Sequence, residues 1–212
     1  MNNKSFLIRK ISLIGALGAL TVLLGITPIG FIRLPLGLAI TLLHIPTIIG
    51  TFLAGGIGGT CIGAIFGIFS LFKAASNPVG LDALFVNPLI SVLPRLLLAP
   101  TVFLIFKAFN KIKNMPKSVS AAVSAVLGTL LHTVYVSLAL YIFAGSQVTQ
   151  LMEGKGLGAF IVLLLPNAIA ESIAAAIISA AVIGVISSTG KKSKLSQINQ
   201  TEESVEKEEN SK

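Results

Sequence analysis

Charged residues are scarce in this sequence, and their scarcity decides the broad class of protein. Only 11% of the 212 residues are Asp, Glu, Lys or Arg, whereas 54% are hydrophobic and the mean hydropathy is +0.91. Soluble proteins carry about 25% charged residues. A chain with so few charges does not form an ordinary water-exposed surface, so we predict a protein whose solvent is largely the lipid bilayer.

Cysteine and tryptophan are also nearly missing. Cys61 is the only cysteine, and there is no tryptophan. A single cysteine excludes an intrachain disulfide framework and a metal site built from several cysteines. The formal net charge of +8 does not indicate nucleic-acid binding, because the cations are not interleaved with aromatic residues.

The motifs of several enzyme classes are absent. The sequence has no P-loop, no Gly-x-Ser-x-Gly elbow, and no His-x-x-x-His or His-Glu-x-x-His spacing. We therefore expect no catalytic site, no metal and no cofactor. Uphill transport by such a chain would need a partner ATPase or an ion gradient.

Six apolar segments are separated by glycine, proline, asparagine and charged residues, and each approaches the roughly 20 residues that a membrane-spanning helix needs. They are residues 6–26, 36–54, 57–72, 88–109, 119–144 and 157–188. Only a glycine-rich run at 55–59 separates the second from the third, which predicts an antiparallel pair with a tight turn. The sixth is long enough to tilt, kink near Pro166 or extend into the headgroups. We predict an all-α membrane protein with a bundle of six transmembrane helices.

Lysine and arginine predict the orientation of this bundle. With six spans, three basic clusters fall on one side: Lys4, Arg9 and Lys10; Lys111, Lys113 and Lys117; Lys191, Lys192 and Lys194. The other side carries only Arg33, Lys73 and Lys155. The positive-inside rule then places both termini in the cytoplasm of a multi-pass cell-membrane protein.

The sequence changes character after Gly190. It becomes polar and ends in several glutamates mixed with Ser, Asn and Lys. Such a segment does not bury a core. We expect a transmembrane domain at 1–190 and a disordered, charged cytoplasmic tail at 191–212.

Five polar residues inside the predicted spans are candidates for binding a solute: His44, Arg95, His132, Asn167 and Glu171. A polar or charged group in hydrocarbon is costly unless it is paired or hydrated, so these side chains are expected to face the interior of the bundle. At about 1.5 Å of helix per residue they lie roughly 10 to 21 Å from the outer ends of their helices. A solute site that opens outward needs polar groups in that band.

Structural roles are open for the same residues. Arg95 and Glu171 could neutralise each other as a buried pair that fixes packing. His44 lies just before Ile45-Pro46, where the missing proline N–H frees a carbonyl that His44 could bond. His132 could be an interhelical hydrogen-bond donor. Asn167 and Glu171 are four residues apart and share one helix face, which favours an inward-facing polar stripe.

The first segment carries a patch of small residues, in which Gly15 and Ala19 are four residues apart. This spacing lets another helix backbone approach closely, either within the bundle or from a partner.

Three stretches of the sequence resemble one transporter family: Thr41-Leu-Leu-His44-Ile45-Pro46-Thr-Ile-Ile-Gly50, the segment from Gly59 through Phe66-Gly67-Ile68-Phe69-Ser70-Leu71, and Asn87-Pro88-Leu-Ile-Ser-Val-Leu-Pro94-Arg95. The likeness extends to Gly128-Thr129, His132-Thr133, and Asn167 with Glu171. Together they resemble the substrate-binding S component of energy-coupling factor (ECF) vitamin transporters. Two positions depart from the pattern: His132 stands where Asn is expected, and Ala54-Gly55-Gly56 replaces a Leu-Gly-Pro turn.

The resemblance implies that the chain captures a water-soluble vitamin outside the cell and docks onto a membrane coupling subunit with two ABC-type ATPases. It implies that Gly15 and Ala19 contact the coupling subunit. The solute would lie beneath loops 27–35 and 73–87, and the substrate-binding residues would be Asn87, Arg95, His132, Asn167 and Glu171, to which we add His44. The resemblance also implies that the whole component topples in the membrane during transport.

The run from Asn87 to Arg95 is most similar to pantothenate-type S components, and Arg95 would suit a carboxylate through a bidentate contact. Riboflavin and pyridoxine remain alternatives, whereas no local signature matches thiamine, folate, biotin or cobalamin. Two other classes stand beside an S component. One is an autonomous carrier with Glu171 or His132 as a proton relay, which the lack of an evident internal repeat disfavours. The other is an intramembrane enzyme centred on His44, His132 and Glu171, which lack metal-site spacing.

Overall fold

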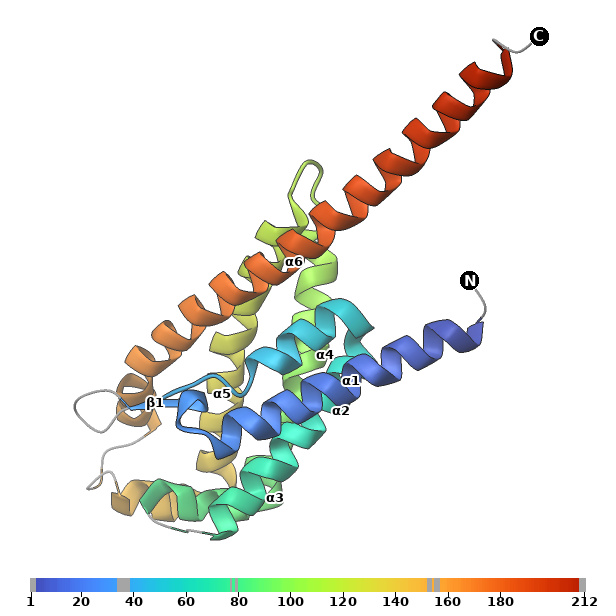
Figure 1. Ribbon diagram of the computed structural model, residues 1–212. Helices are drawn as coiled ribbons and strands as arrows, with labels where there is room; N and C mark the ends of the chain where they lie inside the picture. Colours follow the sequence, from blue (N-terminus) through green and yellow to red (C-terminus); the bar gives the residue numbers. More distant parts are fainter. Residues whose placement is uncertain are drawn as a thin grey trace.

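Helices dominate the computed structural model, which describes residues 3–33, 39–76, 78, 80–151, 154 and 157–209 (Figure 1). In chain order the elements are α1 (Asn3–Ile26), the 3-10 helix η1 (Pro28–Gly30), β1 (Phe31–Arg33), β2 (Ala39–Thr41), α2 (Ile45–Ser76), the 3-10 helix η3 (Gly80–Val86), α3 (Pro88–Ser91), α4 (Leu93–Phe109), α5 (Lys117–Leu151) and α6 (Leu157–Glu209). Apart from the short β pair, the described elements have the predicted helical class.

Five stretches of helix among the described residues are long and apolar enough to cross a membrane: Leu7–Ile26, Ile45–Ser76, Pro88–Phe109, Lys117–Gln150 and Phe160–Thr189. Four of them correspond to predicted segments. The second and third predicted segments are joined in one element, α2. The count of six spans is therefore not confirmed.

Helix α2 folds back on itself at Gly55, which has φ 79° and ψ 177°, a backbone conformation essentially restricted to glycine. Residues on the two sides of this turn face each other, because a Cβ on Gly58 would meet Ala54 and a Cβ on Gly59 would collide with Thr51. Residues 45–54 and 56–76 thus pack as the antiparallel pair predicted from the glycine run. The first half is roughly 15 Å long, which is too short for a hydrocarbon layer about 30 Å thick.

The helix of the second predicted segment also begins later than expected. The sequence predicts it from Leu36, which lies outside the described residues. In the structure β1 and β2 pair antiparallel, with Phe31 opposite Thr41, and the helix begins only at Ile45. Pro46 explains the start, since proline lacks an N–H and is favoured in the first turn of a helix.

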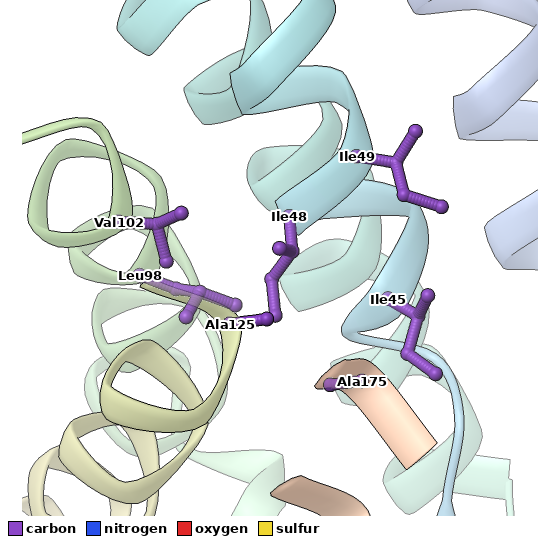
Figure 2. Close-up of a cluster of buried hydrophobic side chains, with 7 residues drawn as sticks. All are labelled: Ile45, Ile48, Ile49, Leu98, Val102, Ala125 and Ala175. Carbon is purple, nitrogen blue, oxygen red and sulfur yellow. The ribbon is translucent and has the colours of Figure 1, made fainter. Parts of the chain in front are cut away.

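The first half of α2 lies at the centre of the bundle. Every residue from 43 to 51 is buried. In Figure 2, Ile48 points toward Ala125 of α5, beside side chains of α4. The complete core cluster joins α2, α4, α5 and α6: Ile45, Ile48, Ile49, Leu98, Val102, Ala125 and Ala175. Contact with three other helices fixes the start of α2, and with it the residue just before the helix, His44.

The second half of α2 approaches α4 so closely that only glycine fits between them. A Cβ on Gly63 would collide with the backbone carbonyl oxygen of Arg95, and a Cβ on Gly67 would lie 2.8 Å from the Cα atom of Val92. Backbone therefore lies against backbone at this interface, and the close contact fixes the position of Arg95.

Two observations concern the ends of the bundle. Helix α5 departs from helical geometry at Ala144 (φ −142°, ψ 27°), the residue at which the fifth segment was predicted to end. Figure 1 shows the β pair, η3 and the last turns of α5 at the end of the bundle away from the two chain termini.

Helix α6 continues past Gly190 to Glu209 and projects beyond the other helices (Figure 1). Lys, Glu and Gln are good helix formers, and Glu203 and Lys207 have the favourable spacing of four residues. The division into a domain at 1–190 and a tail at 191–212 stays a prediction, and residues 210–212 lie outside the described part.

Replacing Gly55 by alanine should destabilise the protein by about 1–3 kcal/mol, because alanine is strained in this backbone conformation. The measurement is the midpoint of thermal unfolding in detergent. Gly145→Ala is the matched control, since a Cβ there meets nothing within 4 Å and its φ is not positive. An unchanged midpoint in Gly55→Ala, or an equal drop in both variants, would contradict the tight reversal.

Candidate functional site

Predicted site residues from three helices and the β2–α2 connection meet in one buried cluster. The rings of His44 and His132 lie 15° from parallel with their centroids 6.3 Å apart. Phe66 of α2 lies 6.2 Å from the His132 ring, and its own ring is 5.3 Å from the Cζ atom of Arg95. We call His44, Arg95, His132 and Glu171 the polar cluster.

Arg95 is held by aromatic rings and one carbonyl. It is only 7% exposed, and its Nη1 atom donates to the carbonyl oxygen of Ile90 at 3.0 Å. The guanidinium also lies 5.0 Å from the ring of Phe85 in η3, and cation–π contact with Phe66 and Phe85 stabilises its charge. Its Nε atom has no hydrogen-bond partner among the described residues. The side chain is thus fixed while one of its donors faces no protein acceptor.

Arg95 and Glu171 do not form the buried ion pair that the sequence left open. The Oε1 atom of Glu171 accepts hydrogen bonds from the backbone N–H of Thr41 at 2.7 Å and from the Thr41 hydroxyl at 2.6 Å. Within the part of the chain that the structure describes, no carboxylate lies within ion-pair distance of Arg95. The two residues lie close enough for their charges to attract, but Glu171 is directed to the end of β2.

The two histidines are buried with one ring nitrogen unpartnered on each. His44 is 1% and His132 8% exposed, and the Nε2 atom of each lacks a hydrogen-bond partner in the part of the chain that the structure describes. Thr47 and Thr129, each one turn from a histidine, have buried hydroxyls in the same condition. Roughly 90% or more of buried polar groups are hydrogen-bonded in native proteins, so these four atoms have bonding capacity that the described protein atoms do not use.

The two asparagines have different positions. Asn87 caps α3, because its Oδ1 atom accepts a hydrogen bond from the backbone N–H of Leu89 at 3.0 Å. Asn167 lies half-buried on α6, one turn before Glu171, as the sequence spacing predicts.

Sequence reasoning missed three contributors to the cluster: Thr41, Phe66 and Phe85. No signal marks the phenylalanines, since 12 are present in an apolar sequence and most are expected to pack against helices or lipid. Thr41 could have been recognised from the sequence, though only weakly. It lies three residues before His44, and short polar side chains often form hydrogen bonds with nearby backbone.

A family model for the substrate-specific component of ECF transporters matches residues 9–186. The chain belongs to this family. The family and the apolar helices indicate a multi-pass plasma-membrane protein. Members of this family are transport subunits rather than enzymes, and membership implies a substrate and an ECF module as partners. No curated protein matched the chain. The resemblance to S components drawn from the sequence is thus confirmed at the level of the family.

The small-residue patch of this S component lies on the outer face of α1. Gly15 and Ala19 are exposed, and a Cβ on Gly15 would meet nothing within 4 Å. Gly18 points the other way, because a Cβ there would meet the side chain of Ile65 on α2. Packing within the bundle therefore uses Gly18 and leaves the Gly15–Ala19 face uncovered.

Replacing Asn87 by alanine should destabilise the protein by about 1 kcal/mol through loss of the α3 cap, whereas Asn87→Ser should retain most of the stability. Thermal unfolding of the three proteins measures both effects. Asn87 would instead be a solute contact if Asn87→Ser kept the wild-type midpoint but lost solute binding.

Proposed function

We propose that this S component captures a water-soluble vitamin that carries a carboxylate, with pantothenate as the first candidate. It then delivers the vitamin through a coupling subunit and two ABC-type ATPases. The observation that carries the proposal is the buried Arg95 guanidinium, which has no ion pair within the described residues.

The energetics of Arg95 favour an anionic solute. A buried cation without a counter-ion is unfavourable in a membrane protein, and a cation–π contact contributes only about 2 kcal/mol when it is desolvated. A carboxylate would add charge-assisted hydrogen bonds to the guanidinium and complete the missing pair. Glu171 does not fill this role, because its Oε1 atom is bonded to Thr41.

The remaining unpartnered atoms suit the rest of such a solute. The Nε2 atoms of His44 and His132 and the hydroxyls of Thr47 and Thr129 can bond hydroxyl and amide groups, which pantothenate carries beside its carboxylate. Riboflavin and pyridoxine have no carboxylate and would leave Arg95 unpaired. In this proposal His132 binds the solute at the position where Asn was expected, and Asn167 adds a polar side chain from α6.

Mass spectrometry of small molecules released from detergent-purified protein tests the substrate, and we expect pantothenate at near-stoichiometric yield. Arg95→Gln should weaken pantothenate binding by at least roughly 30-fold, because truncating one partner of a buried charge pair costs about 2–5 kcal/mol or more. Arg9→Gln is the control, since Arg9 is exposed on α1. Retention of riboflavin or pyridoxine instead, or equal binding by Arg95→Gln, would refute the carboxylate assignment.

The coupling subunit docks, in this proposal, on the uncovered face of α1. Both termini lie in the cytoplasm, because the three basic clusters then satisfy the positive-inside rule. The close approach that Gly15 and Ala19 permit is typical of helix–helix contacts in membranes.

The double variant Gly15→Leu/Ala19→Leu should retain vitamin binding but lose ATP-dependent uptake in proteoliposomes with the complete module, because the larger side chains prevent close helix contact. Ala181→Leu, at an exposed position of α6, should lose neither activity. Undiminished uptake by the double variant would remove the docking role. Uptake by wild-type protein without the module would favour an autonomous carrier.

A further inference from the structure

A second apolar cluster lies at the end of the bundle where η3 and the last turns of α5 are found (Figure 1). Its buried members come from α3, α5 and α6, and half-buried side chains of η3, α5 and α6 pack against them. We call it the distal cluster: Ile90, Leu140, Ala144, Val148 and Phe160, with Leu84, Phe85, Val136 and Leu164 packed against them. The distal cluster thus fixes η3 and α3 against the last two helices.

Two members of the distal cluster also contact the guanidinium of Arg95. The Cζ atom of Arg95 lies over the ring of Phe85, 5.0 Å from its centroid. The carbonyl oxygen of Ile90 accepts a hydrogen bond from the Nη1 atom of Arg95 at 3.0 Å. Phe66 of α2 adds a further ring, with its centroid 5.3 Å from the Cζ atom. The charge of Arg95 is therefore held from three elements other than its own helix, α4.

The two phenylalanines are fixed in different ways. Phe66 is only 4% exposed, and its ring also lies 6.2 Å from that of His132 inside the polar cluster. Phe85 is half-buried and belongs to the short helix η3. The backbone N–H of Asn87 donates to the carbonyl oxygen of Leu84 at 3.3 Å, which closes the turn that carries Phe85. Phe85 thus connects the distal cluster to the polar cluster.

An aromatic ring holds a cation differently from a carboxylate. A phenyl ring attracts the charge through its quadrupole and offers no oxygen lone pair to the N–H groups. Among the described residues, the Nε atom of Arg95 has no hydrogen-bond partner. A carboxylate in place of Phe85 would neutralise the guanidinium and occupy donors that an anionic solute needs. The aromatic contacts therefore hold the guanidinium in place and keep a donor for an incoming anion.

We propose that Phe85 is a positioning residue for Arg95, and that it determines the preference of this S component for a solute with a carboxylate over the same solute with a neutral group. An arginine side chain has many rotamers, and ordering it only when the solute arrives lowers the affinity. Phe85 orders the guanidinium beforehand. The preference for a carboxylate rests on the proposed function, whereas the contact that orders Arg95 does not.

The contact can be measured without any solute, because the chain contains three arginines, Arg9, Arg33 and Arg95. The full chain is labelled with ¹⁵N-arginine, purified in detergent and studied by ¹H–¹⁵N correlation NMR. Arg95→Gln assigns the side-chain signals of Arg95. Protons that lie over an aromatic ring are shielded by its ring current. We expect Arg95 N–H signals that are shifted upfield in the wild type and lose part of this shift in Phe85→Leu.

Leu84→Ala is the matched control, because Leu84 packs against the same distal cluster and has no ring to place over Arg95. It should lower the midpoint of thermal unfolding but keep the Arg95 shift. Phe85→Met is a second variant without a ring, and it should lose the same part of the shift as Phe85→Leu. An unchanged shift in both Phe85 variants, or an equal change in Leu84→Ala, would overturn the positioning role.

Binding measurements test the preference for a carboxylate. Pantothenate is compared with the analogue in which a primary alcohol replaces the carboxylate. The wild type should bind the acid more tightly, and the ratio of the two affinities should fall roughly 2- to 12-fold in Phe85→Leu, because the acid must then order the guanidinium. Phe85→Tyr keeps a ring over Arg95 and Leu84→Ala keeps Phe85, so both should retain the wild-type ratio. An unchanged ratio in Phe85→Leu would overturn the preference, even if both compounds bound more weakly.

A double-mutant cycle with Arg95 completes the test. Because Phe85 acts through Arg95, Phe85→Leu should not lower the ratio further in an Arg95→Gln background. A further fall would mean that Phe85 contacts the solute itself, and it would overturn the positioning role. If the wild type binds neither compound, the proposed function fails, while the NMR signals of Arg95 still decide whether Phe85 orders the guanidinium.

Discussion

The reversal of α2 at Gly55 is the constraint on which the rest of the structure depends. It places a helix of roughly 15 Å in the centre of the bundle, where its side chains contact α4, α5 and α6. His44 immediately precedes that helix and is buried against His132 of α5. Without the reversal, residues 45–54 would run on toward the opposite end of the bundle as part of a straight helix, and the polar cluster would lose the element that joins its members.

The side chains of the polar cluster are held in place by neighbouring residues, yet several of their polar atoms make no hydrogen bond within the described residues. Phe66, Phe85 and a backbone carbonyl hold Arg95, while Glu171 holds Thr41, three residues before His44. The Nε atom of Arg95 and the Nε2 atom of His44 nevertheless have no hydrogen-bond partner among the described residues. Side chains fixed in this way lose little conformational entropy when a solute arrives, which favours tight binding.

Much of this arrangement could be predicted from the sequence, and the failures have specific physical causes. A polar residue in an apolar span must face inward, so the burial of Arg95 and His132 follows from hydropathy alone. The glycine run indicated the reversal for the same kind of reason. The Glu171–Thr41 contact could not be predicted, because it depends on a β pair of three-residue strands and joins residues far apart in sequence. Complementary charge suggested Arg95 as the partner of Glu171. In the structure, β2 lies against α6, and Glu171 therefore bonds to Thr41 instead.

The glycine interface between α2 and α4 leaves no room for a side chain. At Gly63 and Gly67 any side chain would meet the backbone of the neighbouring helix, and rotamer changes do not move backbone atoms out of the way. Exchange of a cluster residue such as His132 leaves that interface untouched. Side chains of the polar cluster can therefore be exchanged without loosening the contact between the two helices, whereas a substitution at Gly63 or Gly67 would push the helices apart.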